Sequence, residues 1–287
     1  MRLRIAIPVL LCITSSFAVH PQQQSIRFRP VREEVLWSRL EHAPASNADR
    51  ELELKSLLIE AGCPPENLAE VKVSHSDTPN LICTITGLTD KLIIVGAHFD
   101  KVHAGDGMAD NWSGASMLPS LLHALLGERL RHRFLFIGFT DEEKGLVGST
   151  DYVKHLNKEE KEMISAMVNL DTLGLGPTEV WASHADKNLL NALVRTASSL
   201  KSPIMGVNVD RIGTSDSEPF REKKIPAITI HSVTSKNLHI LHSPDDKLQA
   251  IQREDYAESY RLIAGYLAYL DVFLDSAPPP PPPPPRK

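Results

Sequence analysis

The sequence lacks three features that would point to other classes of protein. It has no excess of basic residues: the formal net charge is −5 and the basic residues are scattered, which argues against a nucleic-acid binder because phosphate binding needs a basic face. It contains no internal repeats. Its apolar amino-terminal stretch, residues 5–17, is too short to span a bilayer comfortably, so we expect no stable membrane span in the mature chain.

The first 18 residues have the composition of a secretion signal. A basic start is followed by an apolar stretch and by the small residues that a signal peptidase requires, Ser16-Phe17-Ala18. Such a signal, at residues 1–18, predicts a secreted or periplasmic protein. Its removal deletes Cys12 and leaves only Cys63 and Cys83. In an exported protein these two cysteines either form a disulfide or remain two buried thiols.

The other end of the chain is also expected to lie outside the folded domain. Residues 278–285 are an unbroken proline run, followed by Arg286 and Lys287, and such a run forms polyproline II without a packed core. This tail, residues 278–287, either binds an unknown proline-recognising partner or the cell envelope, or is simply solvated. One domain is expected at residues 19–277, since 42% of the 287 residues are hydrophobic, enough for one sizeable core.

Strand-like and helix-like segments alternate between these ends. Helices are expected at residues 48–61, 112–126, 148–156, 188–200 and 254–274. Strands are expected at residues 71–73, 81–86, 92–97, 134–139, 164–170, 179–182 and 227–230. Pro119 is expected to kink or shorten its helix. The alternation predicts an α/β fold: a single domain with a mixed, mostly parallel twisted sheet and helices on both faces.

Polar side chains follow three of the predicted strands. His98 ends one apolar run, Glu142 and Glu143 come shortly after another, and Asp171 directly follows a third. Ligands of open α/β sheets bind beyond the carboxyl ends of the strands. We therefore expect these four side chains to meet at one edge of the sheet.

Two loops contribute further polar side chains. Asp110 lies in a glycine-containing loop, residues 105–114, just before a predicted helix, although Asp110 or Asn111 could instead cap that helix. His242 lies in a late loop and, taken alone, would more often be a surface histidine. Carboxylates brought this close together repel by on the order of 1 to 4 kcal/mol per pair at surface-like dielectric. Two divalent cations that share one carboxylate account for the whole set, and mixed imidazole and carboxylate ligands suit zinc better than calcium or magnesium.

Five motifs in this order resemble the co-catalytic zinc aminopeptidases, the group of bacterial leucyl aminopeptidase, aminopeptidase Y and glutamate carboxypeptidase. The resemblance covers roughly residues 80–270 and rests on these segments: Ala97-His98-Phe99-Asp100, Ala109-Asp110-Asn111-Trp112-Ser113-Gly114, Asp141-Glu142-Glu143-Lys144-Gly145-Leu146-Val147-Gly148-Ser149, Asn169-Leu170-Asp171 and His242-Ser243-Pro244-Asp245-Asp246. A single His-x-Asp is weak evidence, whereas five ordered motifs are specific. Residues 19–277 are therefore expected to form a zinc peptidase domain.

The resemblance implies two zinc ions per chain. His98 and Asp171 would hold one ion, Glu143 and His242 the other, and Asp110 would bridge the two. The implied activity is that of an aminopeptidase, which removes amino-terminal residues from peptides or small proteins by means of a hydroxide shared between the ions.

Three further positions take roles from the same resemblance. Glu142 would be the general base, because its neighbour Glu143 already points at a metal and adjacent side chains diverge. Asp100 and Asp246 match positions that orient the ligand histidines in the family pattern.

The sequence departs from the family pattern in two places. Trp112 stands where a small residue is expected, so it either lines the substrate pocket or packs in the core. Ser217 replaces the histidine of the family's Ser-Asp-His segment, which removes whatever contact that histidine makes. Ser215 and Asp216 of this segment are still expected to belong to a loop on the substrate side.

Two alternatives remain for the function. Glutaminyl-peptide cyclases share this scaffold and use one zinc ion, and they resemble the chain at residues 215–220. Leu241, however, stands before His242 where a cyclase would have tryptophan. A non-catalytic module that keeps the fold is disfavoured, because such proteins lose ligands and all positions are filled here.

Overall fold

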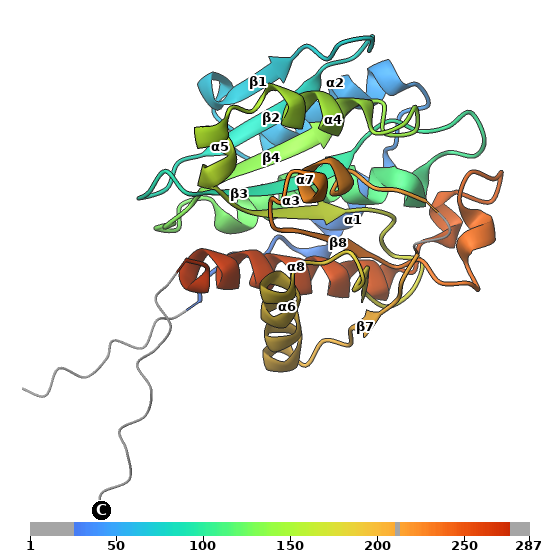
Figure 1. The fold of residues 1–287 in the computed structure, drawn as a ribbon. Coiled ribbons are helices and arrows are strands. Elements are labelled where there is room, and N and C mark those ends of the chain that lie inside the picture. Colours follow the sequence, from blue (N-terminus) through green and yellow to red (C-terminus); the bar gives the residue numbers. More distant parts are fainter. Residues whose placement is uncertain (1–25, 210–212, 276–287) are drawn as a thin grey trace, which may run out of the picture.

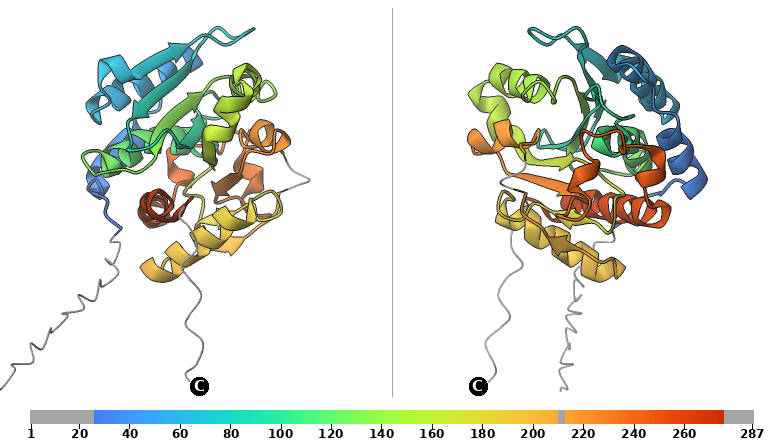
Figure 2. Two further views of the ribbon diagram at one scale, coloured as in Figure 1. Left: turned by 60° about the vertical axis from the view of Figure 1, so that its left-hand side comes forward. Right: turned by 90° about the vertical axis from the view of Figure 1, so that its right-hand side faces the viewer.

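A computed structural model describes residues 26–209 and 213–275 of the chain (Figure 1). The predicted signal peptide and polyproline tail lie outside the described residues. The described part forms one α/β unit in which a central sheet lies between two layers of helices, visible from two further sides in Figure 2. The predicted fold class is confirmed.

The sheet has eight strands in the order β1-β2-β4-β3-β5-β8-β6-β7. Their bounds are β1 Leu68–Val71, β2 Asn80–Ile85, β3 Leu92–His98, β4 Arg133–Phe139, β5 Ile164–Leu170, β6 Glu179–Val180, β7 Met205–Gly206 and β8 Ala227–His231. The central strands β4, β3, β5 and β8 run parallel to one another. Antiparallel pairings join β1 to β2, β2 to β4 and β6 to β8, and β7 pairs in parallel with β6.

Helices cover both faces of the sheet. Their bounds are α1 Glu33–Glu41, α2 Asn47–Glu60, α3 Ser113–Leu125, α4 Val147–His155, α5 Lys158–Met163, α6 Lys187–Leu200, α7 Glu218–Glu222 and α8 Arg253–Phe273. The helices α1, α2, α3 and α8 enclose the larger core on one face, with α6 packed against α8, and α4 and α7 lie on the other (Figures 1 and 2).

Alternate side chains of the central strands supply the two cores. In β3, Ile93 and Val95 point into the larger core whereas Ile94 points into the smaller one, and all three are fully buried. Successive residues of a strand face opposite sides of the sheet, so a continuous apolar run is what a strand covered on both faces requires. The hydrophobic runs in the sequence therefore identify the strands at the centre of the sheet.

The structure corrects several local predictions. The first strand covers Leu68–Val71 rather than residues 71–73, and α1, α5, α7 and β7 were not predicted. Pro119 does not shorten α3, which continues past it to Leu125. Almost every residue of α3 is buried, so its packing against the sheet outweighs the backbone hydrogen bond that proline cannot donate.

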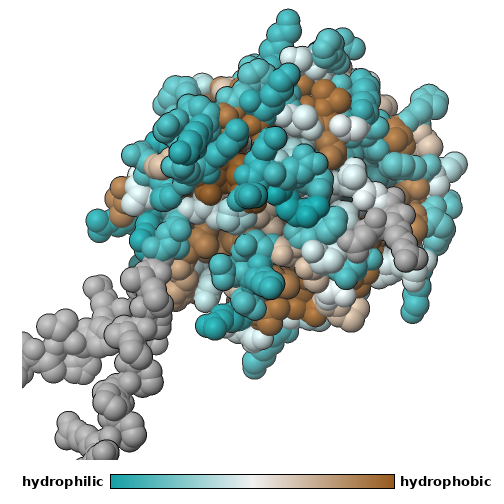
Figure 3. All heavy atoms as spheres, in the orientation of Figure 1, coloured by the Kyte–Doolittle hydropathy of each residue, from teal (hydrophilic) through white to brown (hydrophobic). Residues whose placement is uncertain are grey.

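The surface is mixed in character. The face drawn in Figure 3 is covered largely by hydrophilic side chains, with smaller apolar areas between them. Within residues 26–209 and 213–275, no helix has both the length and the apolar character needed to cross a membrane.

Cys63 and Cys83 form a disulfide that joins the turn after α2 to the middle of β2. The bridge closes a loop between cysteines separated by 20 positions in the sequence. A loop of this length restricts the unfolded chain enough to stabilise the fold by about 3 kcal/mol.

Reduction of the disulfide is therefore expected to lower the free energy of unfolding by about 3 kcal/mol, measured by urea denaturation with and without a reductant. The Cys63→Ala/Cys83→Ala double variant is the matched control, since its stability should be lower from the start and insensitive to the reductant. Equal unfolding midpoints for the oxidised and the reduced chain would contradict this assignment.

Candidate metal centre

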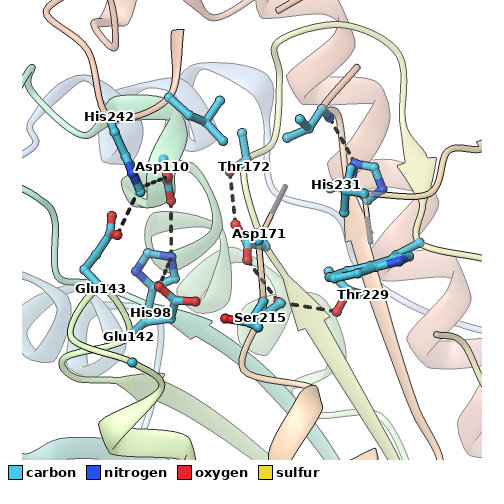
Figure 4. Close-up of a pocket in the computed structure, with 17 residues that line it drawn as sticks. His98, Asp110, Glu142, Glu143, Asp171, Thr172, Ser215, Thr229, His231 and His242 are labelled. Carbon is cyan, nitrogen blue, oxygen red and sulfur yellow. Dashed lines mark hydrogen bonds and ion pairs between the residues drawn. The ribbon is translucent and has the colours of Figure 1, made fainter. Parts of the chain in front are cut away.

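The three central strands deliver their polar residues to one edge of the sheet. His98 is the last residue of β3, Asp171 directly follows β5, and Glu142 and Glu143 lie in the turn after β4. Because β4, β3 and β5 are parallel neighbours, their carboxyl ends lie side by side. The structure thus brings together the four strand-end residues that the sequence singles out (Figure 4).

The loop between β3 and α3 places Asp110 among them. Gly107 begins a short helical turn with a left-handed backbone, φ 59° and ψ 40°, which favours glycine. The Asp246 carboxylate then accepts hydrogen bonds from the backbone N–H groups of Ala109, at 2.6 Å, and Asp110, at 3.2 Å. The carboxylate of Asp110 is left to point at the two histidines.

Asn111, rather than Asp110, accepts a hydrogen bond from the first turn of α3. Asn111 Oδ1 accepts the backbone N–H of Gly114, at 3.0 Å, and the backbone N–H of Thr172, also at 3.0 Å. Its amide nitrogen donates to the carbonyl of Leu170, at 2.9 Å. Asn111 therefore ties the start of α3 to the end of β5 while its neighbour faces the site.

Asp110 lies between the two histidines and turns one carboxylate oxygen toward each. Its Oδ1 is 3.3 Å from His98 Nε2, and its Oδ2 is 3.2 Å from His242 Nε2. Glu143 Oε2 lies 3.0 Å from the same nitrogen of His242. The side chains fall into two groups that could each hold a metal ion, His98 with Glu142 and Asp171, and Asp110 with Glu143 and His242.

These residues fit zinc in both spacing and chemistry. Ligand atoms about 2.0 to 2.1 Å from a tetrahedral zinc ion lie about 3.4 Å from one another. The separations between Asp110 and the two histidines, 3.3 and 3.2 Å, are close to that value. In addition, Glu143 Oε1 is buried without a hydrogen-bond partner. A buried carboxylate oxygen of this kind needs a proton or a cation, and a mixed imidazole and carboxylate set favours zinc.

The acidic groups of the site cannot all ionise unaided. Burial, followed by the charges of Asp216 and Asp171, raises the pKa of Glu142 to about 10. Burial and the charge of Asp110 raise the pKa of Glu143 to about 7. The hydrogen bond to Asp110 raises the pKa of His242 to about 9. Cation binding would replace the protons held by these groups, because metal ligands bind in their deprotonated forms.

Asp100 connects His98 to the two glutamates. Its Oδ1 lies 3.4 Å from His98 Nδ1 and accepts the backbone N–H of Glu142 at 3.0 Å, while its Oδ2 accepts that of Glu143 at 3.2 Å. Asp100 is placed to orient His98, as the resemblance implies. Asp246 differs, because its carboxylate binds the backbone of the loop that carries Asp110 rather than a ligand histidine.

The segment that begins at Gly213 contributes the Ser215 hydroxyl to the site. Ser215 Oγ donates to Asp171 Oδ2 at 3.0 Å and accepts from the Asn169 amide at 2.6 Å. Ser215 lines the pocket, whereas Asp216 is fully buried behind it. Ser217, which replaces the family's histidine, is buried and shares a hydrogen bond with the Thr229 hydroxyl at 2.7 Å, so it takes no part in the pocket wall.

A cavity of about 280 Å³ opens beside the two groups of potential ligands. Its lining also includes apolar and aromatic side chains, Trp181, Val209, Val233 and Leu241, together with His231, which Figure 4 labels. None of these residues was predicted to line a pocket. Trp181 lies in a predicted strand, residues 179–182, which was the one signal for it, since a pocket lining assembled from separate loops has no local pattern.

Trp112 does not line this cavity. It is completely buried, and its indole N–H donates to the Arg39 carbonyl at 3.2 Å. The core interpretation of this departure from the family pattern is therefore correct.

Fold and site together place the chain in the zinc-exopeptidase-like class of α/β proteins. The chain belongs to peptidase family M28, which matches residues 80–267. It is 27% identical over 202 residues to a probable leucine aminopeptidase of Arthroderma benhamiae, an alignment covering 66% of this chain and 56% of that protein. The chain thus spans little more than half the length of this curated relative.

Solved structures agree on the fold. The LapA aminopeptidase of Legionella pneumophila superposes with a TM-score of 0.73 at 23% identity, over 85% of this chain and 73% of that one. A glutaminyl cyclase from an Acidobacteriales bacterium superposes with a TM-score of 0.70 at 15% identity, over 88% of this chain and 98% of that one. Both activities occur on this fold, so the choice between them depends on the site.

Proposed function

We propose that this protein is a metal-dependent aminopeptidase with two zinc ions per chain. The observation that carries the proposal is the position of Asp110, whose two oxygens lie 3.3 Å from His98 and 3.2 Å from His242. A carboxylate shared in this way joins two groups of ligands into one centre. His98 and Asp171 would hold one ion, Glu143 and His242 the other, with Asp110 between them.

The bound ions and two acidic residues would have separate roles in peptide hydrolysis. Zinc ions bound here would acidify a water molecule and stabilise negative charge on the scissile carbonyl oxygen. Glu142 lies at the pocket, with Oε2 4.0 Å from His98 Nε2, and would take the proton of the attacking water and pass it to the leaving amine. Asp100 would hold the Glu142 backbone in place for this transfer.

The pocket favours a substrate with a free amino terminus. The acidic side chains that line the cavity would attract a protonated amine, and the apolar side chains of Trp181, Val233 and Leu241 would receive the adjoining side chain. An amine positioned next to the metal centre places the first peptide bond at the attacking water. Such a substrate would lose one amino-terminal residue.

We also propose that the chain acts outside the cytoplasm. The disulfide between Cys63 and Cys83 supports export, because such bridges persist in oxidising compartments. The signal-like residues 1–18 support it independently. From its composition, we propose that the proline run at residues 278–285 binds a proline-recognising partner.

The proposed function is tested on the purified chain. Bound zinc is counted by elemental analysis, and three substrates are compared: leucyl p-nitroanilide, its N-acetylated form and a peptide that begins with glutamine. We expect two zinc ions, hydrolysis of the free-amine substrate only, and loss of turnover with a chelator. One zinc ion with cyclisation of the glutamine peptide would establish the cyclase instead, and a chain without metal would refute both functions.

A further inference from the structure

The first turn of α2 contacts the loop between β3 and α3 directly. Asn47, at the start of the helix, pairs with the backbone of Lys101: its Oδ1 accepts the Lys101 N–H at 3.1 Å, and its Nδ2 donates to the Lys101 carbonyl at 3.4 Å. This helix lies before residues 80–267, the part that matches the family. A segment outside the family match therefore binds the loop that carries Asp100 and Asp110.

Arg50, one turn later, holds the same loop at both of its ends. Its guanidinium group is completely buried and donates to the carbonyl of Phe99 at 3.2 Å and to that of Gly107 at 3.1 Å. It also donates to the carbonyl of Asp106, and its Nε donates to Pro44 at 3.0 Å. A planar guanidinium with five donors in fixed directions can span several carbonyl groups at once.

These contacts lie next to metal-site residues. Phe99 and Lys101 flank Asp100, which is placed to orient His98 and binds the backbone of both glutamates. Gly107 begins the turn that ends with Asp110 facing both histidines. Any change in the distance between residues 99–101 and 106–107 would therefore move Asp110 relative to His98 and the two glutamates.

Trp112 completes the arrangement. The Arg50 guanidinium carbon lies 5.4 Å from the centre of the Trp112 ring, a cation–π contact with the indole that stands where the family pattern has a small residue. Burial lowers the pKa of Arg50 to about 10, against the raising influence of Asp246 and Asp100, so the group stays charged near neutral pH.

From these contacts we infer that Asn47 and Arg50 of α2 form a positioning clamp, which fixes the loop between Asp100 and Asp110 and thereby sets the affinity of the centre for metal. The inference rests on the proposed two-metal site. The charge of Arg50 and its hold on the loop predict opposite effects of its replacement on zinc affinity. Removing a buried positive charge from an acidic site would by itself strengthen cation binding, whereas releasing the loop would weaken it.

The test measures zinc affinity of the full chain by chelator competition, together with the visible spectrum of the Co²⁺-substituted protein. Arg50→Met should weaken zinc binding about 10- to 100-fold and alter the cobalt spectrum, as loss of groups that support metal ligands does. Arg50→Lys keeps the charge without the planar fork and should restore only part of the affinity. Asn47→Ala removes the uncharged contact with the Lys101 backbone and should weaken zinc binding about 10-fold.

Arg39→Met is the matched control. Arg39 is a second arginine with little exposure, but its guanidinium binds Ser120 at 2.9 Å and Glu60 at 3.3 Å rather than the loop. This variant should lose thermal stability in the metal-free form yet bind zinc within about twofold of the unsubstituted chain, well short of the 10-fold loss expected at supporting positions.

Three results would overturn the clamp. The first is zinc binding in Arg50→Met as tight as in the unsubstituted chain or tighter. The second is an equal loss of affinity in Arg39→Met, which would reveal general loosening. The third is an unchanged affinity in Asn47→Ala, which decides the matter if Arg50→Met does not fold. Failure of the unsubstituted chain to bind zinc would instead refute the proposed function, and the clamp with it.

Discussion

Replacing Asp110 by alanine is expected to abolish both metal binding and peptidase activity. The carboxylate faces His98 with one oxygen and His242 with the other, so, as the proposed bridge, it would be a ligand of both ions. We expect zinc affinity to fall by more than about 100-fold and turnover to fall to background. Elemental analysis after dialysis, with the leucyl p-nitroanilide assay, measures both.

Asp106→Ala is the control for Asp110→Ala. It removes the same charge from the same loop, but its side chain is exposed and its backbone carbonyl, which Arg50 binds, is retained. This variant should keep both ions and most of its activity. An Asp110→Ala protein that still carried two zinc ions per chain would show that the carboxylate does not bridge them.

Replacing Glu142 by glutamine is expected to lower kcat by about 10²- to 10⁴-fold, the usual contribution of a general base, with both ions retained. The amide has the same shape as the carboxyl group but cannot accept the proton of the attacking water. KM should change little, because the pocket wall stays intact. Steady-state kinetics and metal content of the same preparation separate these effects.

The position of Glu142 makes metal content the deciding measurement. Glu142 lies with His98 and Asp171 in one potential ligand group, so a role as ligand is the competing assignment. If Glu142→Gln lost one zinc ion, the carboxylate would be a ligand and the base would have to be sought elsewhere. Glu143→Gln is the comparison, since we expect it to lose the ion that it shares with His242.

The strand ends of the sheet were predictable from the sequence because each rests on a local pattern. A continuous apolar run identifies a strand that is covered on both faces of the sheet. Polar residues at the carboxyl ends of parallel strands lie at the same edge of the sheet, where ligands bind. His98 and Asp171 were found in this way. Asp110 and His242 come from loops, so their place in the set depended on the resemblance to known zinc aminopeptidases.

Contacts between distant segments could not be predicted. Arg50 binds carbonyl groups 49 to 57 positions further along the chain, and a charged residue in an early helix gives no sign of burial. The contacts of Asp246 differ from those that the resemblance implies. Its carboxylate accepts backbone N–H groups near residue 110, and no pattern in the sequence around Asp246 indicates them. The rule that proline ends a helix fails at Pro119, because the burial of α3 stabilises the helix on both sides of it.

The wide spacing of the ligands along the chain has a consequence for how the protein matures. His98 and His242 lie on either side of strands β4, β5, β6, β7 and β8, so no shorter stretch of the chain contains a complete centre. A complete centre does not exist in the unfolded chain, so the binding of metal would be coupled to folding. The proposed zinc centre would therefore be complete only after the whole segment from His98 to His242 has folded, and bound ions would stabilise that folded state.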